Sequence, residues 1–266
     1  MNTLQKVVLG FVQAILEWLP VSSQGFMILI AVNAFGETAE EALRIAIYFH
    51  LGTALAVLIK YREFYIESIF RKREDLRFLI YATVMTGVTG VPLYFLLRDV
   101  FSEYSGTIVT LLIGVTLLVT ATFLRKGRLN DAGTLTREDR TIKDELLVGA
   151  VQGCAILPGI SRSGSTLTFL ILRGYEKEEA FHMSFVISLP AVLASIAFDI
   201  LIEGTEILLE WDYFLVMGIV CVVGYLTMDL LLRMAKNMSF DKICYILGAI
   251  TIILASIILA INPTTV

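Results

Sequence analysis

The chain has 266 residues, of which 57% are hydrophobic and only 17% charged, with a formal net charge of −4. Soluble domains are about half apolar and roughly a quarter charged, so this composition excludes both an ordinary soluble domain and a disordered chain and indicates a polytopic membrane protein. The absence of one basic patch argues against a nucleic-acid partner, and three cysteines with two histidines exclude a disulfide framework and a histidine-rich metal site.

Two apolar segments are interrupted by residues that break helices. Residues 7–36 contain Glu17 and, at 20–25, a proline followed by a Ser/Gly turn, and residues 146–172 contain a similar interruption at 158–164. Proline and glycine free backbone groups that cannot face lipid. Each segment is therefore predicted to be a re-entrant helix-loop-helix pair that enters and leaves the membrane on one side.

Six other segments are predicted to span the membrane, because each is uncharged, or nearly so, over about the 20 residues that cross a bilayer. They are residues 42–59, 78–97, 104–124, 180–198, 211–232 and 243–266. The connections 60–77, 125–143 and 233–242 are rich in Lys and Arg, whereas 199–212 has acids and no base. The positive-inside rule places the basic connections in the cytoplasm, and the crossings then put both termini outside.

The two halves of the chain share a weak internal repeat. Gly10-Phe-Val-Gln13 recurs as Gly149-Ala-Val-Gln152, and each copy precedes a proline and a Ser/Gly turn. The predicted organisation is one membrane domain with a first repeat at 1–124, a cytoplasmic linker at 125–145 and a second repeat at 146–266. An odd number of crossings per half inverts the second copy, which is an architecture common in transporters. Chance similarity between apolar segments is the alternative.

Polar residues gather at the two helix breaks. Glu17 and Arg162 are the clearest ionisable residues at membrane depth, where a charge marks a functional site by default. The Ser/Gly turns open helices whose free N–H groups favour an anion, and arginine grips two phosphate oxygens at once. Together they predict a phosphate or pyrophosphate site, with Glu17 as base or as ligand of a divalent cation. A purely structural Glu–Arg pair would leave the clustered hydroxyls unexplained.

The two motifs, Glu17-Trp-Leu-Pro-Val-Ser-Ser-Gln-Gly25 and Pro158-Gly-Ile-Ser-Arg-Ser-Gly-Ser-Thr166, resemble those of the undecaprenyl-pyrophosphate phosphatases of the bacitracin-resistance type. The resemblance covers essentially the whole chain. It implies six spans with two re-entrant pairs, a plasma-membrane location and a site open to the outer face. It also implies hydrolysis of a polyprenyl pyrophosphate to the monophosphate, which recycles the lipid carrier of envelope glycan synthesis.

The resemblance also assigns roles to individual residues. Catalysis falls to Glu17, Ser23 and Arg162, and substrate binding to Gln13, Ser22, Gly25, Ser161, Ser163 and Thr166. Two positions depart from the family pattern, because Gln13 replaces the first glutamate of a pair and Phe26 replaces a histidine. His50 belongs to a further familial stretch, but its apolar surroundings favour a helix-packing role.

The predicted mechanism uses Arg162 and the hydroxyls to stabilise the phosphoryl group, with Mg²⁺ or Ca²⁺ near Glu17 offsetting the remaining charge. Either water or Ser23 attacks. The lost carboxylate and histidine leave open a flippase, a transporter of polyprenyl phosphate or a binder that does not hydrolyse. Membrane lipids are the expected surroundings, and the oligomeric state, a homodimer included, is left open.

Overall fold

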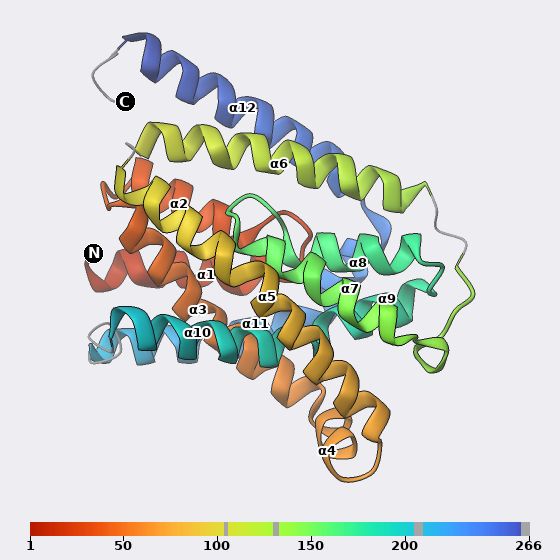
Figure 1. Ribbon diagram of the computed structural model, residues 1–266. Coiled ribbons are helices and arrows are strands. Elements are labelled where there is room, and N and C mark those ends of the chain that lie inside the picture. Colours follow the sequence, from red (N-terminus) through yellow and green to blue (C-terminus); the bar gives the residue numbers. More distant parts are fainter. Residues whose placement is uncertain (104–105, 130–132, 205–209, 262–266) are drawn as a thin grey trace.

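A computed structural model describes residues 1–103, 106–129, 133–204 and 210–261 (Figure 1). Within these residues the regular secondary structure is helical, apart from one isolated β-bridge between Leu135 and Tyr175. The helices of the first part are α1 (Thr3–Leu16), α2 (Ser23–Asn33), α3 (Ala39–Lys60), α4 (Arg62–Phe70), α5 (Arg73–Glu103) and α6 (Gly106–Arg128). Those of the second are η1 (Arg137–Asp139), α7 (Ile142–Gly153), η2 (Cys154–Ile156), α8 (Arg162–Leu172), α9 (Lys177–Val186), α10 (Ser188–Glu203), α11 (Trp211–Asn237) and α12 (Phe240–Ile261).

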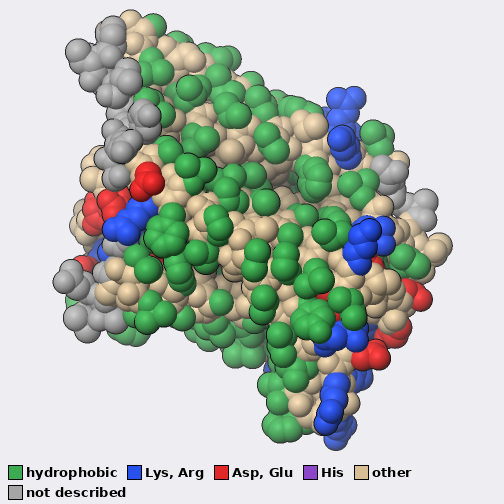
Figure 2. All heavy atoms as spheres, in the orientation of Figure 1, with side chains coloured by type: hydrophobic (Ala, Val, Ile, Leu, Met, Phe, Trp, Pro, Cys, Tyr) green, Lys and Arg blue, Asp and Glu red, His purple; other side chains and the backbone are tan. Residues whose placement is uncertain are grey.

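Six of the described helical segments are long and apolar enough to cross a membrane. Five are single helices, α3, α5, α6, α11 and α12, and the sixth joins α9 to α10 through a bend at Ile187. Each overlaps one predicted span, so the expectation of an all-helical polytopic membrane protein with six long apolar helices is confirmed. Figure 2 shows hydrophobic side chains over the middle of the molecule and charged ones gathered toward its two ends.

Four shorter helices replace the two interrupted segments. Helices α1, α2, α7 and α8 have 14, 11, 12 and 11 residues. At about 1.5 Å per residue none reaches across a bilayer core of about 30 Å. Residues 17–22 separate α1 from α2, and residues 154–161 separate α7 from α8, so each segment is interrupted near its predicted proline and Ser/Gly turn.

The short helices are held in the bundle by glycines at close helix contacts. Helix α1 packs against α11, where a Cβ on Gly10 would lie 2.6 Å from a methyl carbon of Val216. Helix α7 packs against α5, where a Cβ on Gly149 would overlap the carbonyl of Ala82. A side chain at either position would push the two helices apart. Glycine therefore allows α1 to pack closely against α11, and α7 against α5.

Several predicted boundaries lie partly outside the described residues. This concerns the spans 104–124 and 243–266, the linker 125–145 and the acidic connection 199–212. The division into two repeats and a linker stays a prediction. The N-terminus and the end of α12 lie on one side of the bundle in Figure 1, and the basic end of α6 lies on the other.

Candidate functional site

The two helix breaks meet at the centre of the bundle. Ser22 adopts a left-handed conformation with φ of 66°, which is rare for a residue with a side chain. Its Oγ accepts hydrogen bonds from Gly25 N at 3.3 Å and from Gly159 N at 3.0 Å. A Cβ on Gly25 would lie 2.8 Å from Gly159 N. The two turns therefore touch backbone to backbone, and glycine is required where they cross.

Each turn leads into a helix, and the N-termini of these two helices lie close together. Ser22 caps α2, and Ser161 caps α8 by accepting from Gly164 N at 3.1 Å. The first N–H groups of a helix have no partner within it, and the helix dipole adds partial positive charge there. Two such ends, one from each half of the chain, create a setting that favours an anion.

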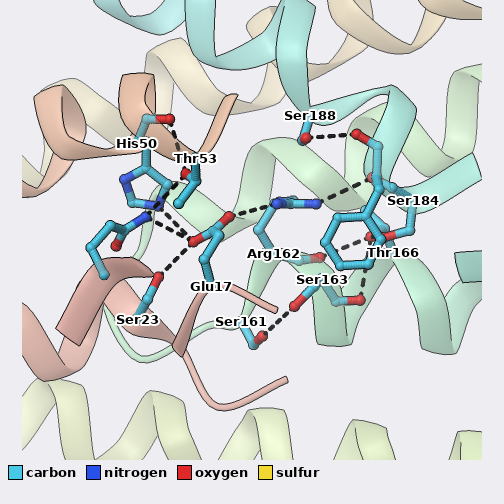
Figure 3. A network of polar contacts seen from close by, with 12 residues as sticks. Glu17, Ser23, His50, Thr53, Ser161, Arg162, Ser163, Thr166, Ser184 and Ser188 are labelled. Atoms are coloured by element: carbon cyan, nitrogen blue, oxygen red, sulfur yellow. Dashed lines mark hydrogen bonds and ion pairs between the residues drawn. The ribbon is translucent and has the colours of Figure 1, made fainter. Parts of the chain in front are cut away.

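Glu17 and Arg162 form an ion pair across the two turns, 145 positions apart in the chain. Arg162 Nη2 donates to Glu17 Oε1 at 2.5 Å, and Arg162 Nη1 donates to Ser184 O at 3.2 Å. The guanidinium also lies over the Phe185 ring, 5.3 Å from its centroid. The predicted proximity of Glu17 and Arg162 is thus confirmed (Figure 3).

Glu17 Oε2 faces three further donors (Figure 3). Ser23 Oγ donates to it at 2.7 Å and Gln13 Nε2 at 3.0 Å, while His50 Nε2 lies 3.3 Å away. The other ring nitrogen, His50 Nδ1, lies 2.6 Å from Ala46 O. The expectation that His50 is a helix-packing residue is therefore wrong, because α3 turns this ring toward the carboxylate.

These residues border a cavity of about 360 Å³. Six of the predicted site residues line it, namely Glu17, Ser22, Ser23, Ser161, Arg162 and Ser163, and His50 joins them. Such a volume is within the usual range for small-molecule sites. The charged and amide side chains of the lining are Glu17, Gln24 and Arg162 at or beside the two turns, His50 on α3 and Gln152 on α7. Helices α5 and α10 contribute a further part of the lining.

Three predicted substrate-binding residues lie behind this lining. Gln13 is fully buried and supports Glu17, while Gly25 provides the contact between the turns. Thr166 is also fully buried, and its hydroxyl lies 2.6 Å from Ser184 Oγ, behind Arg162. Phe26 packs toward an apolar cluster with Val21. Positions 13, 25 and 166 therefore shape the site without lining its cavity.

Ser184 and His50 are the site residues that sequence reasoning missed. Ser184 lies in an apolar stretch outside both motifs, and only the fold brings its carbonyl to Arg162. His50 carried one signal, because it begins a stretch that resembles the family, yet hydropathy alone favoured packing. No ionisable neighbour in the sequence indicated that the ring would meet Glu17.

Comparison with known proteins gives a consistent result over nearly the whole chain. The family model of the bacitracin resistance protein BacA matches residues 6–254. A protein of Methanothrix thermoacetophila named undecaprenyl-diphosphatase is 41% identical over 257 residues, covering 97% of this chain and 98% of the relative.

Two further relatives carry the same name. The one from Methanococcoides burtonii is 35% identical, with 94% of this chain and 97% of the relative covered. The one from Haloarcula marismortui is 34% identical, with 93% and 95% covered. The family model and the relatives each match nearly the full length of the chain, and the chain therefore belongs to the bacitracin resistance protein BacA family.

Proposed function

We propose that this protein is an integral-membrane undecaprenyl-diphosphatase, which hydrolyses a polyprenyl pyrophosphate to the monophosphate and inorganic phosphate. The observation that carries the proposal is the Glu17–Arg162 pair, placed in a cavity where two helix N-termini converge. Arginine, helix N-termini and hydroxyls suit a phosphate group, and a carboxylate beside them suits a base. The names of the relatives agree with this chemistry.

In the proposed reaction the terminal phosphoryl group lies against Arg162 and the first turn of α8. An attacking oxygen, from water or from Ser23, gives its proton to Glu17 Oε2, to which the Ser23 hydroxyl already donates at 2.7 Å. The bond from the terminal phosphorus to the bridging oxygen breaks, and the prenyl monophosphate leaves. If Ser23 attacks, water then releases its phosphate ester. Arg162 stabilises the charge that develops on the phosphoryl oxygens.

His50 would make the cavity wall cationic. One ring nitrogen faces a carbonyl oxygen and the other a carboxylate, so each nitrogen must carry a hydrogen to make a favourable contact. The lining then has two cationic side chains, His50 and Arg162, against the single carboxylate of Glu17. Without His50, Glu17 would cancel the charge of Arg162. An excess of positive charge is what a pyrophosphate requires.

Replacing His50 by glutamine is therefore expected to raise the KM for a prenyl pyrophosphate by roughly tenfold or more, because a hydrogen bond to a charged group contributes about 1.5–3 kcal/mol. Steady-state phosphate release from the purified protein in detergent measures it. His182→Gln is the matched control, since this second histidine packs between Tyr61 and Phe64 outside the cavity lining. Equal effects of the two substitutions would refute a role for His50 in binding.

The divalent cation stays a prediction. No group of three His, Cys, Asp or Glu side chains within the described part of the chain could hold a metal ion. Glu17 lines the cavity and would hold Mg²⁺ or Ca²⁺ if phosphate oxygens of the substrate completed its coordination, as is common for Mg²⁺. Such an ion would offset charge on the pyrophosphate.

We further propose that the short helix pairs are re-entrant and that the two halves form an inverted repeat. The swapped packing supports this, because α1 of the first half contacts α11 of the second and α7 of the second contacts α5 of the first. The proposed location is the plasma membrane with the cavity toward the outer face, and a homodimer is compatible with this arrangement. The orientation rests on the charge pattern of the predicted connections, and the location rests on the family.

The deciding experiment is phosphate release from farnesyl pyrophosphate and longer prenyl pyrophosphates, with and without EDTA. We expect release by the protein and, if the cation prediction holds, its loss in EDTA and recovery on adding Mg²⁺ or Ca²⁺. If the folded protein released no phosphate under any of these conditions, the proposed hydrolytic activity would be refuted. Movement of polyprenyl phosphate across vesicles by the same preparation would then favour the transporter.

A further inference from the structure

Two neighbouring helices, α5 and α10, form one wall of the cavity. On α5 the lining residues are Thr83, Thr86, Gly87, Gly90, Val91 and Tyr94, spaced so that they share one face. On α10 they include Ser188, Ala191, Val192, Ser195 and Phe198, again on one face. The α5 face alone extends about 16 Å along the helix axis.

This wall is apolar although it contains hydroxyl groups. Thr83 and Thr86 donate to the carbonyls of Leu79 and Ala82 in their own helix, at 2.7 and 2.8 Å. On α10, Ser188 and Ser195 likewise donate to the carbonyls of residues 185 and 192, at 2.6 and 2.9 Å.

Tyr94 donates to buried Asp199 at 3.1 Å. No hydroxyl hydrogen on this wall is therefore left for an anion, and the wall presents methyl groups, glycines and rings.

The apolar surface continues past Thr83. A second groove of about 330 Å³ shares this residue with the cavity. Its other lining residues are apolar except Tyr65, whose hydroxyl donates to Val186 O at 2.8 Å, and they include Ile69, Leu79, Ile80 and Pro190. A ligand whose head contacts Arg162 can thus place a long apolar chain against a continuous surface of α5 and α10.

We propose that the facing surfaces of α5 and α10 are the binding site for the prenyl chain of the substrate. This proposal rests on the proposed function, because the pyrophosphate at Glu17 and Arg162 defines which end of the ligand lies where. Small residues, Gly87, Gly90 and Ala191, provide the room. The isoprene units next to the pyrophosphate lie between the two helices, and the rest of the chain leaves along the second groove or into lipid.

Gly87 offers a clean test, because a Cβ built there meets no atom within 4 Å. Gly87→Leu would therefore place a side chain in the proposed prenyl-chain site without a backbone clash. Leucine also has a higher helix propensity than glycine. Gly218 is the matched control, since it also lies inside a long helix, α11, with no atom within 4 Å of its Cβ, and it does not line the cavity. Gly87→Ala gives an intermediate size.

We expect Gly87→Leu to raise the KM for farnesyl pyrophosphate roughly tenfold or more, the size expected when an apolar pocket loses well-packed methylene contacts. Gly87→Ala should have a smaller effect, and Gly218→Leu none. Inhibition by inorganic pyrophosphate, which has no chain, should remain unchanged in all three variants.

An unchanged KM for farnesyl pyrophosphate in Gly87→Leu would place the chain elsewhere and overturn the proposal. Equal weakening of farnesyl pyrophosphate and inorganic pyrophosphate would overturn it too, because the substitution would then act on the head site. Failure of the proposed function looks different, since the wild-type protein would release no phosphate from any prenyl pyrophosphate.

Discussion

Replacing Arg162 by alanine is expected to lower kcat/KM for phosphate release by about 10³-fold or more. Removing one donor that stabilises transition-state charge typically costs 10²–10³-fold, and this donor is also a full charge. In the structure Arg162 is the only residue that joins Glu17 to α9, through Nη2 and Nη1 at 2.5 and 3.2 Å, within the hydrogen bonds described. Truncation would leave His50 as the single cation beside Glu17, so the site would lose the excess positive charge that faces an anionic substrate.

The conservative variant separates charge from geometry. Arg162→Lys keeps a cation but not the planar fork that meets two oxygens at once, so we expect it to recover only part of the loss. Arg137→Ala is the control for removal of an arginine, since its partners Glu138 and Glu179 lie outside the cavity lining. Thermal unfolding in detergent checks that each variant is folded. Near wild-type turnover of Arg162→Ala would refute the site.

The architecture could be predicted because its causes are local. Length and hydropathy mark the six long helices, and the proline and Ser/Gly turns mark the interruptions that precede α2 and α8. The meeting of Glu17 with Arg162 also followed from the sequence, since an internal repeat predicts that two equivalent breaks face each other. A buried charge needs a partner at depth, so each residue supported the position of the other.

The remaining parts depend on which face each helix turns inward. His50 and the lining residues of α5 lie within uncharged helical segments. There hydropathy indicates the depth of a residue in the membrane but not the direction in which its side chain points. The same limit explains Gln13, which the family pattern pairs with Glu17, and Thr166 of the second motif, because both lie behind the lining. A motif records what a site needs, and it does not separate residues that touch a ligand from those that hold them.

Replacing Glu17 by glutamine is expected to lower kcat by about 10²–10⁴-fold, the range for loss of a positioned acid–base group. Glutamine has the same shape and can still accept a hydrogen bond from Arg162, so KM should change far less than kcat. A pure structural role in the ion pair predicts the opposite, namely a loss of folded protein with normal turnover by what remains. Steady-state kinetics together with thermal unfolding in detergent distinguishes the two.

The neighbouring glutamine supplies a matched control for position. The double variant Gln13→Glu with Glu17→Gln has the wild-type composition and charge, but its carboxylate moves one helical turn along α1. Position 13 is fully buried and does not line the cavity, whereas position 17 does and contacts Arg162. We therefore expect the exchanged protein to be as inactive as Glu17→Gln alone. Restored turnover would mean that a carboxylate anywhere on this face suffices, and the base would not be fixed at Glu17.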